Sequence, residues 1–283
     1  MTSDPRKNEY VADPEDMKEM ARLIRQDKAW SFVMPEVFSK QVWKTFREVI
    51  DIGCGPGGWC LDMASRFPKT NFIGIDISNR MLQYANLLAM AETRENVAFK
   101  LMDVTKSLDF PDNSFDLVNG RLMNAFLTTE KWPNVLREAF RVLRPGGRIF
   151  LMDLEASYSN SAAYEKGGLL LTQAGTAVGR SFSHTGVSSG ISAVLKGLLR
   201  NAGFSDVKHE ILGLEFSHSR PEEFALWQEN TILLSETFRH FVLHSGVTTE
   251  EELNALNRQA FEDMKRSDFL AMTFMMVAWA IKQ

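Results

Sequence analysis

Three aspartates end short apolar segments of the chain at a nearly regular spacing. Asp51, Asp76 and Asp103 lie 25 and 27 residues apart, at or near the ends of segments that read as buried strands. Because the carboxyl ends of parallel strands meet at one edge of a sheet, the three carboxylates should line one ligand crevice. A single aspartate there would be read as a solvated loop residue or a helix cap. Three at this spacing indicate a binding site.

A glycine-rich turn follows the first of these aspartates. Residues 49–58 read V-I-D-I-G-C-G-P-G-G, and a helix-forming segment comes next. Glycines allow the backbone to bend tightly and to approach a ligand without a Cβ in the way. The free N–H groups at the start of a helix favour a negatively charged ligand group. The stretch therefore predicts a strand, a ligand-binding turn and a helix.

Asp51 separates two kinds of ligand for this turn. Gly53, Gly55 and Gly58 satisfy the dinucleotide pattern G-x-G-x-x-G, which is a weak match alone. The Asp51 carboxylate should point towards the crevice, where it would repel a pyrophosphate. S-adenosylmethionine (SAM), which carries an ammonium, a sulfonium and only a carboxylate, is compatible with it. An acid followed by Gly53-Cys54-Gly55 resembles the first motif of the class I SAM-dependent methyltransferases.

Two later stretches strengthen this resemblance. Residues 108–118, L-D-F-P-D-N-S-F-D-L-V, are similar to the family's turn and fourth strand. Residues 141–148, R-V-L-R-P-G-G-R, are similar to its turn between the fourth helix and the fifth strand. The motifs occur in order over residues 49–154 and are specific as a set. The resemblance implies SAM as cofactor and S-adenosylhomocysteine as product, but no particular substrate.

Roles for the cofactor contacts follow from the spacing and from the resemblance. Asp76 lies where the acid ending the second strand of nucleotide-binding folds bonds the ribose hydroxyls. The resemblance implies that Asp103 and the Val104 N–H bind the adenine amino group and ring. Ile77 and Met81 would then hold the adenine between them, since methionine suits an irregular apolar contact.

Two further residues complete the predicted cofactor site. Cys54 is interpreted as a small residue that fits the loop rather than as a nucleophile. Asn119, which ends the fourth strand, would contact the methionine end of the cofactor through its backbone. The predicted cofactor-binding residues are Asp51, Gly53, Cys54, Gly55, Asp76, Ile77, Met81, Asp103, Val104 and Asn119.

Strands alternate with helices from residue 49 onward, which predicts a mostly parallel sheet with right-handed crossovers. The expected fold class is α/β, a Rossmann-like seven-stranded sheet with an antiparallel last strand and helical lid insertions. The fifth strand is expected at 149–154, and helices outside the core at 14–30, 36–46, 189–202, 221–244 and 249–266. The predicted units are 1–48 (helical lid), 49–154 (cofactor core), 155–187 (lid insertion) and 188–283 (the rest of the core, with a helical insertion at about 217–268).

Composition narrows the range of partners. The 283 residues carry a net charge of −4, which gives no electrostatic reason to expect nucleic acid or an anionic membrane. Two cysteines six residues apart are not a disulfide framework. The N-terminus is polar, and the longest apolar run, 271–281, is too short to span a bilayer. We therefore expect a cytoplasmic protein with a small-molecule acceptor and no nucleic-acid or membrane partner; a homo-oligomer stays open.

Methyl transfer from a sulfonium is an in-line displacement, so positioning and water exclusion should contribute most. A base is needed only when the acceptor must lose a proton. The candidate catalytic residues are His184 and Glu155, although a loop histidine often has no role. The candidate substrate-binding residues are Tyr10, Arg121 and Tyr158, and Arg121 has the cofactor carboxylate as its alternative ligand. Abundant aromatic residues towards the C-terminus predict an apolar or aromatic acceptor, as in secondary metabolism.

Two other functions compete with this interpretation. A dinucleotide-dependent oxidoreductase would use the same glycine turn, but Asp51 and the later motifs oppose it. A SAM-binding protein of the same fold with a non-methylating role stays open, because catalysis here needs little beyond the cofactor site. The sequence does not distinguish O-, N- and C-methylation.

Overall fold

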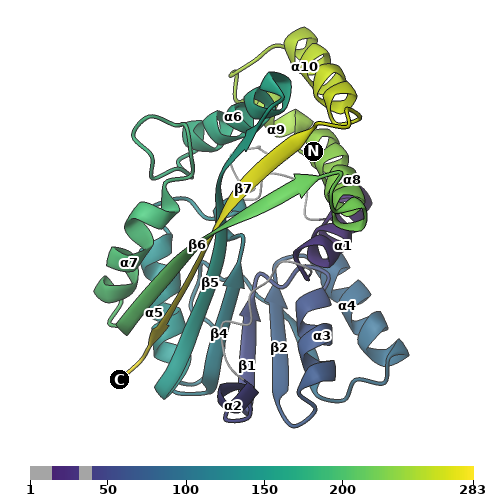
Figure 1. Ribbon diagram of the computed structural model, residues 1–283. Helices are drawn as coiled ribbons and strands as arrows, with labels where there is room; N and C mark the ends of the chain where they lie inside the picture. The colour runs from purple at the N-terminus through teal and green to yellow at the C-terminus, as the bar shows by residue number, and fades with distance from the viewer. Residues whose placement is uncertain (1–14, 32–39) are drawn as a thin grey trace, which may run out of the picture.

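The computed structural model describes residues 15–31 and 40–283, which form one seven-stranded sheet flanked by helices (Figure 1). The strand order is β3-β2-β1-β4-β5-β7-β6. Neighbouring strands from β3 to β5 are parallel, and β7 lies antiparallel between β5 and β6. This confirms the predicted fold class. The strands are β1 (Glu48–Ile52), β2 (Asn71–Asp76), β3 (Val97–Leu101), β4 (Phe115–Arg121), β5 (Leu143–Ser159), β6 (Ser205–Ser217) and β7 (Leu270–Ile281).

Helices connect the strands and extend past the carboxyl edge of the sheet. They are α1 (Met17–Ser31), α2 (Lys40–Trp43), α3 (Gly58–Arg66), α4 (Asn79–Ala91), the 3₁₀ turn η1 (Met123–Ala125), α5 (Trp132–Val142), α6 (Ala162–Ala177), α7 (Ile191–Asn201), α8 (Pro221–Thr237), α9 (Arg239–His244) and α10 (Glu250–Asp263). Within the described ranges, none of these helices has the length and apolarity needed to cross a membrane.

The central strand β1 is apolar on both sides and separates two cores. Ile50 and Ile52 pack into a cluster with α5 and α7, whereas Val49 packs into a cluster with α3 and α8. Successive strand residues point to opposite faces, so the two clusters cover opposite faces of the sheet. Burial on both faces is the usual environment of a parallel strand between helices. The strand ends are thereby held in fixed positions relative to one another.

Several helices gather beyond the carboxyl ends of the central strands. Figure 1 shows α1, α6, α8, α9 and α10 there, around the upper parts of the long strands β5, β6 and β7. Arg25 of α1 pairs with Glu229 of α8 at 3.0 Å. Ser161, the N-cap of α6, donates to the Asp263 carboxylate at the end of α10 at 2.6 Å. We call α1, α6, α8, α9 and α10 the lid helices.

The structure differs from the sequence expectations in two of these elements. The strand expected at 149–154 extends over Leu143–Ser159, because β7 pairs with it from Arg148 to Ser159. The helix expected at 221–244 is divided into α8 and α9 at Phe238, where ψ is 1°. The expected helix at 36–46 is described only from its α2 part, and Tyr10 lies outside the described residues.

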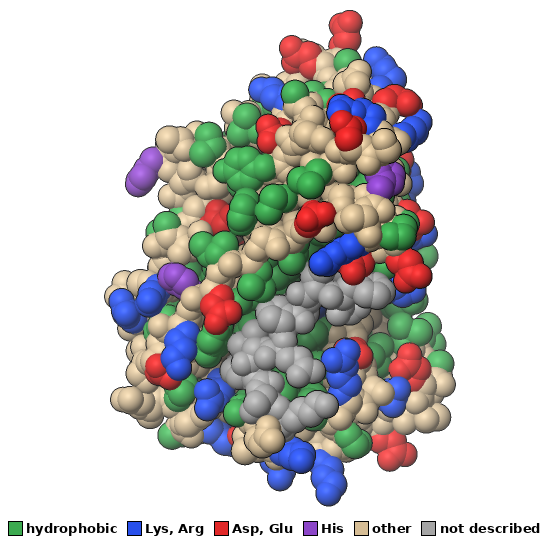
Figure 2. All heavy atoms as spheres, viewed as in Figure 1, with side chains coloured by type: hydrophobic (Ala, Val, Ile, Leu, Met, Phe, Trp, Pro, Cys, Tyr) green, Lys and Arg blue, Asp and Glu red, His purple; other side chains and the backbone are tan. Residues whose placement is uncertain are grey.

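One face of the molecule carries a band of apolar side chains. Figure 2 shows these side chains gathered along the course of β6 and β7. The exposed large hydrophobic residues of β5, β6 and β7 are Tyr158, Ile211, Leu270 and Met272.

The glycine turn should tolerate a side chain poorly at Gly57. This residue has φ 80°, and an added Cβ would lie 2.6 Å from Phe99 Cζ and 2.8 Å from Ala85 Cβ. Gly146 has the similar φ of 82° but has no atom within 4 Å of an added Cβ. Gly57→Ala should therefore lower the free energy of unfolding by about 1–3 kcal/mol more than Gly146→Ala, the cost typical of overpacking. Urea unfolding of both variants measures the difference; equal losses would contradict the crowding argument.

Candidate active site

A cavity of about 370 Å³ opens at the carboxyl ends of β1, β2, β4 and β5. Its volume lies within the usual range of small-molecule sites. The glycine turn and the strand ends form its floor, and residues of α1, α6, α8 and α9 form its walls. The predicted site residues that line it are Gly53, Cys54, Gly55, Asp76, Ile77, Met81, Asp103, Val104, Arg121 and Glu155.

The glycine turn is held against the end of β2 by its own backbone. Gly53 N and Cys54 N each donate to the Ile75 carbonyl at 2.9 Å, and Gly55 N donates to the Asp76 carboxylate at 2.9 Å. Gly53 and Gly55 have φ of 73° and 54°, which non-glycine residues rarely adopt. Burial raises the pKa of the Cys54 thiol well above its usual value, so this cysteine stays neutral. That is consistent with the interpretation of Cys54 as a loop residue rather than a nucleophile.

Asp76 is both a support of the turn and a wall of the cavity. One carboxylate oxygen accepts from Gly55 N and the other from Ser78 N, both at 2.9 Å. Burial raises the pKa of this carboxyl. The Ile77 backbone N–H also interacts with it; since a carboxylate offers about four lone-pair positions, Asp76 retains acceptor capacity for a ligand hydroxyl.

Asp103, Met81 and Val104 surround the neighbouring part of the cavity. Partial burial opposes the ionisation of Asp103, but hydrogen bonds from Thr105 and Lys106 outweigh it and hold the pKa below its usual value. Met81 and Val104 are buried, whereas Ile77 is 59% exposed at the rim. A carboxylate that accepts hydrogen bonds, placed beside apolar walls, suits a flat heteroaromatic ring that carries an amino group.

Asp51 and Asn119 lie outside the residues that line this cavity. Asn119 Nδ2 donates to Asp51 Oδ1 at 2.6 Å, and the Cys60 thiol lies 3.7 Å from Asp51 Oδ2. Burial raises the pKa of Asp51 to about 6, although the Arg121 charge opposes the shift. Their assignment as cofactor contacts therefore stays a prediction.

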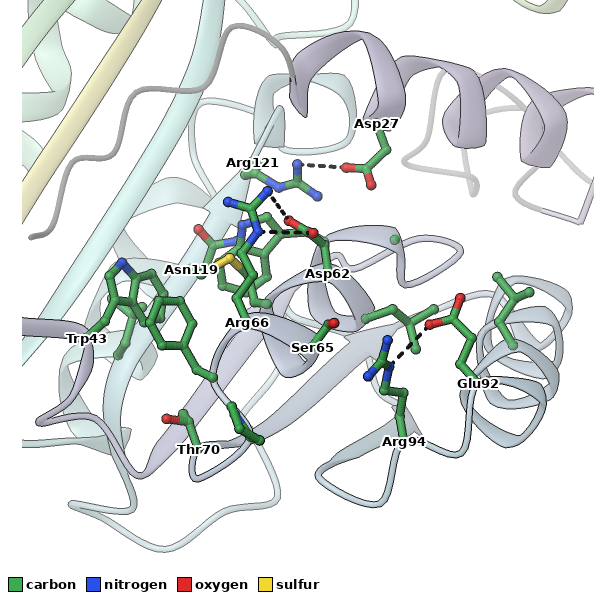
Figure 3. A pocket seen from close by; sticks show the side chains of 18 of the residues that line it. Asp27, Trp43, Asp62, Ser65, Arg66, Thr70, Glu92, Arg94, Asn119 and Arg121 are labelled. Atoms are coloured by element: carbon green, nitrogen blue, oxygen red, sulfur yellow. Dashed lines mark hydrogen bonds and ion pairs between the residues drawn. The ribbon is translucent and has the colours of Figure 1, made fainter. Parts of the chain in front are cut away.

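Arg121 joins the sheet to the lid. Figure 3 shows its guanidinium facing Asp27 of α1, with Nη1 2.9 Å from Asp27 Oδ1. The group also lies over the Trp59 ring, 5.8 Å from its centroid. Burial disfavours its charge, but Asp27 and Asp51 outweigh burial and raise the pKa of Arg121. Its Nε has no hydrogen-bond partner among the described residues, so Arg121 can bind one more acceptor.

Asp153 also lines this cavity, although it was not predicted from the sequence. The residue is 4% exposed, and its two carboxylate oxygens accept from Asn124 N at 2.9 Å and Leu154 N at 3.0 Å. Burial raises its pKa to about 7, and the nearby Glu155 charge acts in the same direction. Its place on the fifth strand is the signal that would have found it, since the same rule selected Asp51, Asp76 and Asp103.

Glu155 lines the cavity, but its oxygens are occupied by the start of α7. They accept from Ser189 Oγ and Gly190 N at 3.0 Å and from Ser192 N at 2.5 Å. A carboxylate at this position satisfies the free N–H groups of the helix start and interacts favourably with its dipole. The geometry assigns Glu155 a clear structural contact; its catalytic role stays a prediction.

The remaining predicted residues lie away from the cavity or outside the described ranges. His184 is exposed on the segment between α6 and α7 and does not line the cavity. Tyr158 is 57% exposed and packs edge-on against Phe274 at 5.8 Å. Either could reach a ligand only after a local rearrangement, and both assignments stay predictions. Apolar lid residues supply the wall instead, namely Leu23, Trp30, Leu171, Leu234, Phe238 and Phe241.

The buried Asp153 carboxyl should make stability depend on pH. An unfolded aspartate ionises near pH 3.9, whereas the pKa of Asp153 in the folded protein is about 7. Between these values the folded state binds the proton more tightly, so the free energy of unfolding should fall as pH rises. The fall from this group is up to about 1.4 kcal/mol per pH unit. Urea unfolding between pH 5 and 7.5 should show a shallower fall in Asp153→Asn.

Asp51, with a pKa of about 6, contributes a fall in the same direction and remains in that variant. The free energy of unfolding should therefore fall with pH in both proteins, and the comparison is between the two slopes. Asp62→Asn, at an exposed carboxyl of α3, controls for the substitution itself. Identical slopes in wild type and Asp153→Asn would contradict the assigned burial effect.

Comparison with known proteins adds to this geometry. Residues 49–147 match the family model described as a methyltransferase domain. The demethylmenaquinone methyltransferase of Lactococcus lactis is 33% identical over 119 residues, which are 42% of this chain and 45% of that protein. The chain thus matches less than half the length of this curated relative.

Solved structures share the fold at low sequence identity. A phosphoethanolamine N-methyltransferase of Haemonchus contortus, in complex with phosphomonomethylethanolamine and S-adenosylhomocysteine, superimposes with a TM-score of 0.52 at 17% identity, over 95% of this chain and 60% of that chain. The [4+2]-cyclase SpnF superimposes with a TM-score of 0.51 at 20% identity, over 83% and 75% of the two chains. At these identities the likeness establishes the fold alone.

Proposed function

We propose that the chain is a class I SAM-dependent methyltransferase, because residues 49–147 match a methyltransferase domain. It would transfer a methyl group from SAM to a small acceptor in the 370 Å³ cavity. One observation carries the proposal. The glycine turn, the Asp76 and Asp103 carboxylates and an apolar chamber under the lid helices open into one cavity. When bound, SAM supplies an electrophilic methyl group to that chamber.

The residues present fit this cofactor. Asp76 lines the cavity and would accept from the ribose hydroxyls, and Asp103 and Val104 line it where the adenine amino group would lie. The unpartnered Nε of Arg121 suits the methionine carboxylate. Gly53 lines the cavity with a φ of 73°, and an added Cβ there would meet the Phe126 ring at 3.0 Å, so a side chain is disfavoured at this position of the turn.

The lid walls support an apolar or aromatic acceptor. Leu23, Trp30, Leu171, Phe238 and Phe241 present hydrocarbon to the cavity from three different lid helices. A wall of this kind suits an acceptor closer in chemistry to a quinone than to phosphoethanolamine, the acceptor named for the Haemonchus protein. An acceptor of secondary metabolism and a cytoplasmic location belong to the same proposal.

The main contributions to rate are positioning and water exclusion. The strand ends fix the cofactor side of the cavity, and the lid helices close the acceptor side. Holding the nucleophile in line with the methyl group removes much of the entropy cost of a bimolecular reaction. Excluding water strengthens every electrostatic contact in the site.

A second function has one observation in its favour. The [4+2]-cyclase SpnF shares this fold, so the fold alone does not require methyl transfer. Incubation with SAM and a panel of small aromatic acceptors separates the two functions. Release of S-adenosylhomocysteine supports the methyltransferase, whereas tight SAM binding without release for any acceptor supports the non-methylating alternative.

The Asp76 carboxylate should dominate recognition of the ribose. Asp76→Ala removes two charge-assisted hydrogen bonds to the hydroxyls, so calorimetry should show SAM binding weakened by about 2–4 kcal/mol. Asp112→Ala is the control, because Asp112 is exposed and does not line the cavity. An unchanged dissociation constant in Asp76→Ala would remove this residue from the site. Tight NAD binding without SAM binding in the wild type would contradict the function itself.

A further inference from the structure

The end of β5 places a carboxylate on the acceptor side of the cavity. The predicted ribose and adenine carboxylates lie on β2 and after β3, on one side of β1. Asp153 lies on β5, on the other side of β1 and beyond β4. It pairs in register with Met276 of β7, inside the sheet. A cofactor that spans the glycine turn therefore has Asp153 beyond its methionine end.

The Asp153 carboxylate has acceptor capacity left. Each of its oxygens accepts one backbone N–H, from Asn124 and from Leu154. The Met123 backbone N–H also interacts with this carboxylate, so of its about four lone-pair positions at least one remains. Asp153 forms no ion pair with any residue in the described ranges. Asp153 lines the cavity, so a ligand group there can donate a hydrogen bond to it.

Asn124 provides a second polar group at the same place. Its backbone N–H fixes Asp153, and its side chain also lines the cavity. Both the oxygen and the nitrogen of its amide are buried without a hydrogen-bond partner in the part of the chain that the structure describes. Buried polar groups are nearly always satisfied, so an amide left open indicates a missing ligand. A hydroxyl, which both donates and accepts, can bond Asn124 and Asp153 together.

The other charged side chains of the cavity have partners other than Asp153. Arg22 pairs with Glu19 at 2.6 Å, and Arg121 pairs with Asp27 at 2.9 Å. Arg180 donates to the Ala125 carbonyl at 3.1 Å. Glu155 is bonded to the start of α7, and Asp76 and Asp103 lie on the cofactor side. Glu155 acts on Asp153 only through its charge.

We propose that Asp153 is the general base for an acceptor hydroxyl of phenol or enol type, and that the Asn124 amide orients this hydroxyl. The inference rests on the proposed function. The acceptor oxygen attacks the methyl carbon and forms the O–CH₃ bond, while the S–CH₃ bond breaks and its electron pair stays on sulfur. The O–H bond breaks, and its proton passes to the Asp153 carboxylate. The acceptor leaves as a neutral methyl ether.

The ionisation of Asp153 suits this role. Burial brings its pKa to about 7, and a base works best when its pKa lies near the working pH. A carboxylate with an ordinary pKa would be ionised at pH 7 but would take a proton from a phenol far less readily. Glu155 instead accepts three hydrogen bonds from the start of α7.

Two probe molecules test the hydroxyl contact directly. 4-Ethylphenol and 4-ethylanisole differ only in the methyl group on oxygen, so the phenol alone donates a hydrogen bond. Their dissociation constants for the S-adenosylhomocysteine complex are measured by ligand-observed NMR from pH 5.5 to 8.5. In the wild type the preference for the phenol should grow about tenfold as Asp153 ionises. In Asp153→Asn the preference should change less than about twofold over the same range.

Two further variants keep the test decisive. Asn124→Leu retains the backbone N–H that holds Asp153, so it should lower the phenol preference at every pH but keep its pH dependence. Asp112→Asn removes an exposed carboxylate outside the cavity and should change neither quantity. Calorimetry with S-adenosylhomocysteine and circular dichroism confirm that each variant is folded. If Asp153→Asn does not fold, Asn124→Leu decides the test. An unchanged preference of Asn124→Leu for the phenol over the anisole would then overturn the proposal.

Turnover completes the test. With SAM in place, the wild type should convert 4-ethylphenol to 4-ethylanisole, and Asp153→Asn should lower kcat by about 10²-fold or more. A pH-independent phenol preference in the wild type, or full turnover in Asp153→Asn, would overturn the base. Binding of neither probe would overturn the acceptor class, and with it the proposal, while leaving methyl transfer intact. Absence of SAM binding to the wild type would instead overturn the proposed function.

Discussion

The arrangement of the site depends on the hydrogen bonds that hold the glycine turn against the end of β2. Ile75 and Asp76 accept from three successive N–H groups, those of Gly53, Cys54 and Gly55. The positive φ angles of the glycines direct these N–H groups to the neighbouring strand. These bonds tie the turn and the Asp76 carboxylate to the end of β2. A ligand then meets a preformed surface and loses little binding energy to ordering it.

The core of the site was predictable because its signals are local in sequence. An apolar strand, a glycine turn and a terminal aspartate lie within ten residues of one another between 49 and 58. The walls were less predictable, because their contacts join distant segments. Arg121 and Asp27 are 94 residues apart, and Glu155 bonds a helix start 37 residues later at Ser192. The spacing of residues along the sequence does not predict such long-range pairs.

The candidate base was also difficult to predict from sequence, because its pKa depends on its surroundings in the fold. A histidine attracts attention in a sequence because its ordinary pKa lies near neutrality, and this favoured His184. In the structure His184 is exposed, whereas burial brings the pKa of Asp153 to about 7. Desolvation depends on what surrounds a carboxyl, which for Asp153 includes η1, β7 and the lid. Those neighbours are fixed only by the fold, so the sequence offered only the strand-end position.

Two ion pairs that join α1 to other elements differ in strength. Arg25 and Glu229 are exposed, and such pairs contribute little because water and salt screen them. Arg121 and Asp27 are mostly buried, so loss of one partner would leave a charge without compensation next to Asp51. The buried pair also lies on the rim of the cavity, where Arg121 keeps one unpartnered nitrogen. The charge that holds α1 to the sheet is therefore the charge that an anionic end of the cofactor would meet. Under the proposed function, a cofactor carboxylate bound to Arg121 would share this guanidinium with Asp27, so cofactor binding and the docking of α1 would depend on the same group.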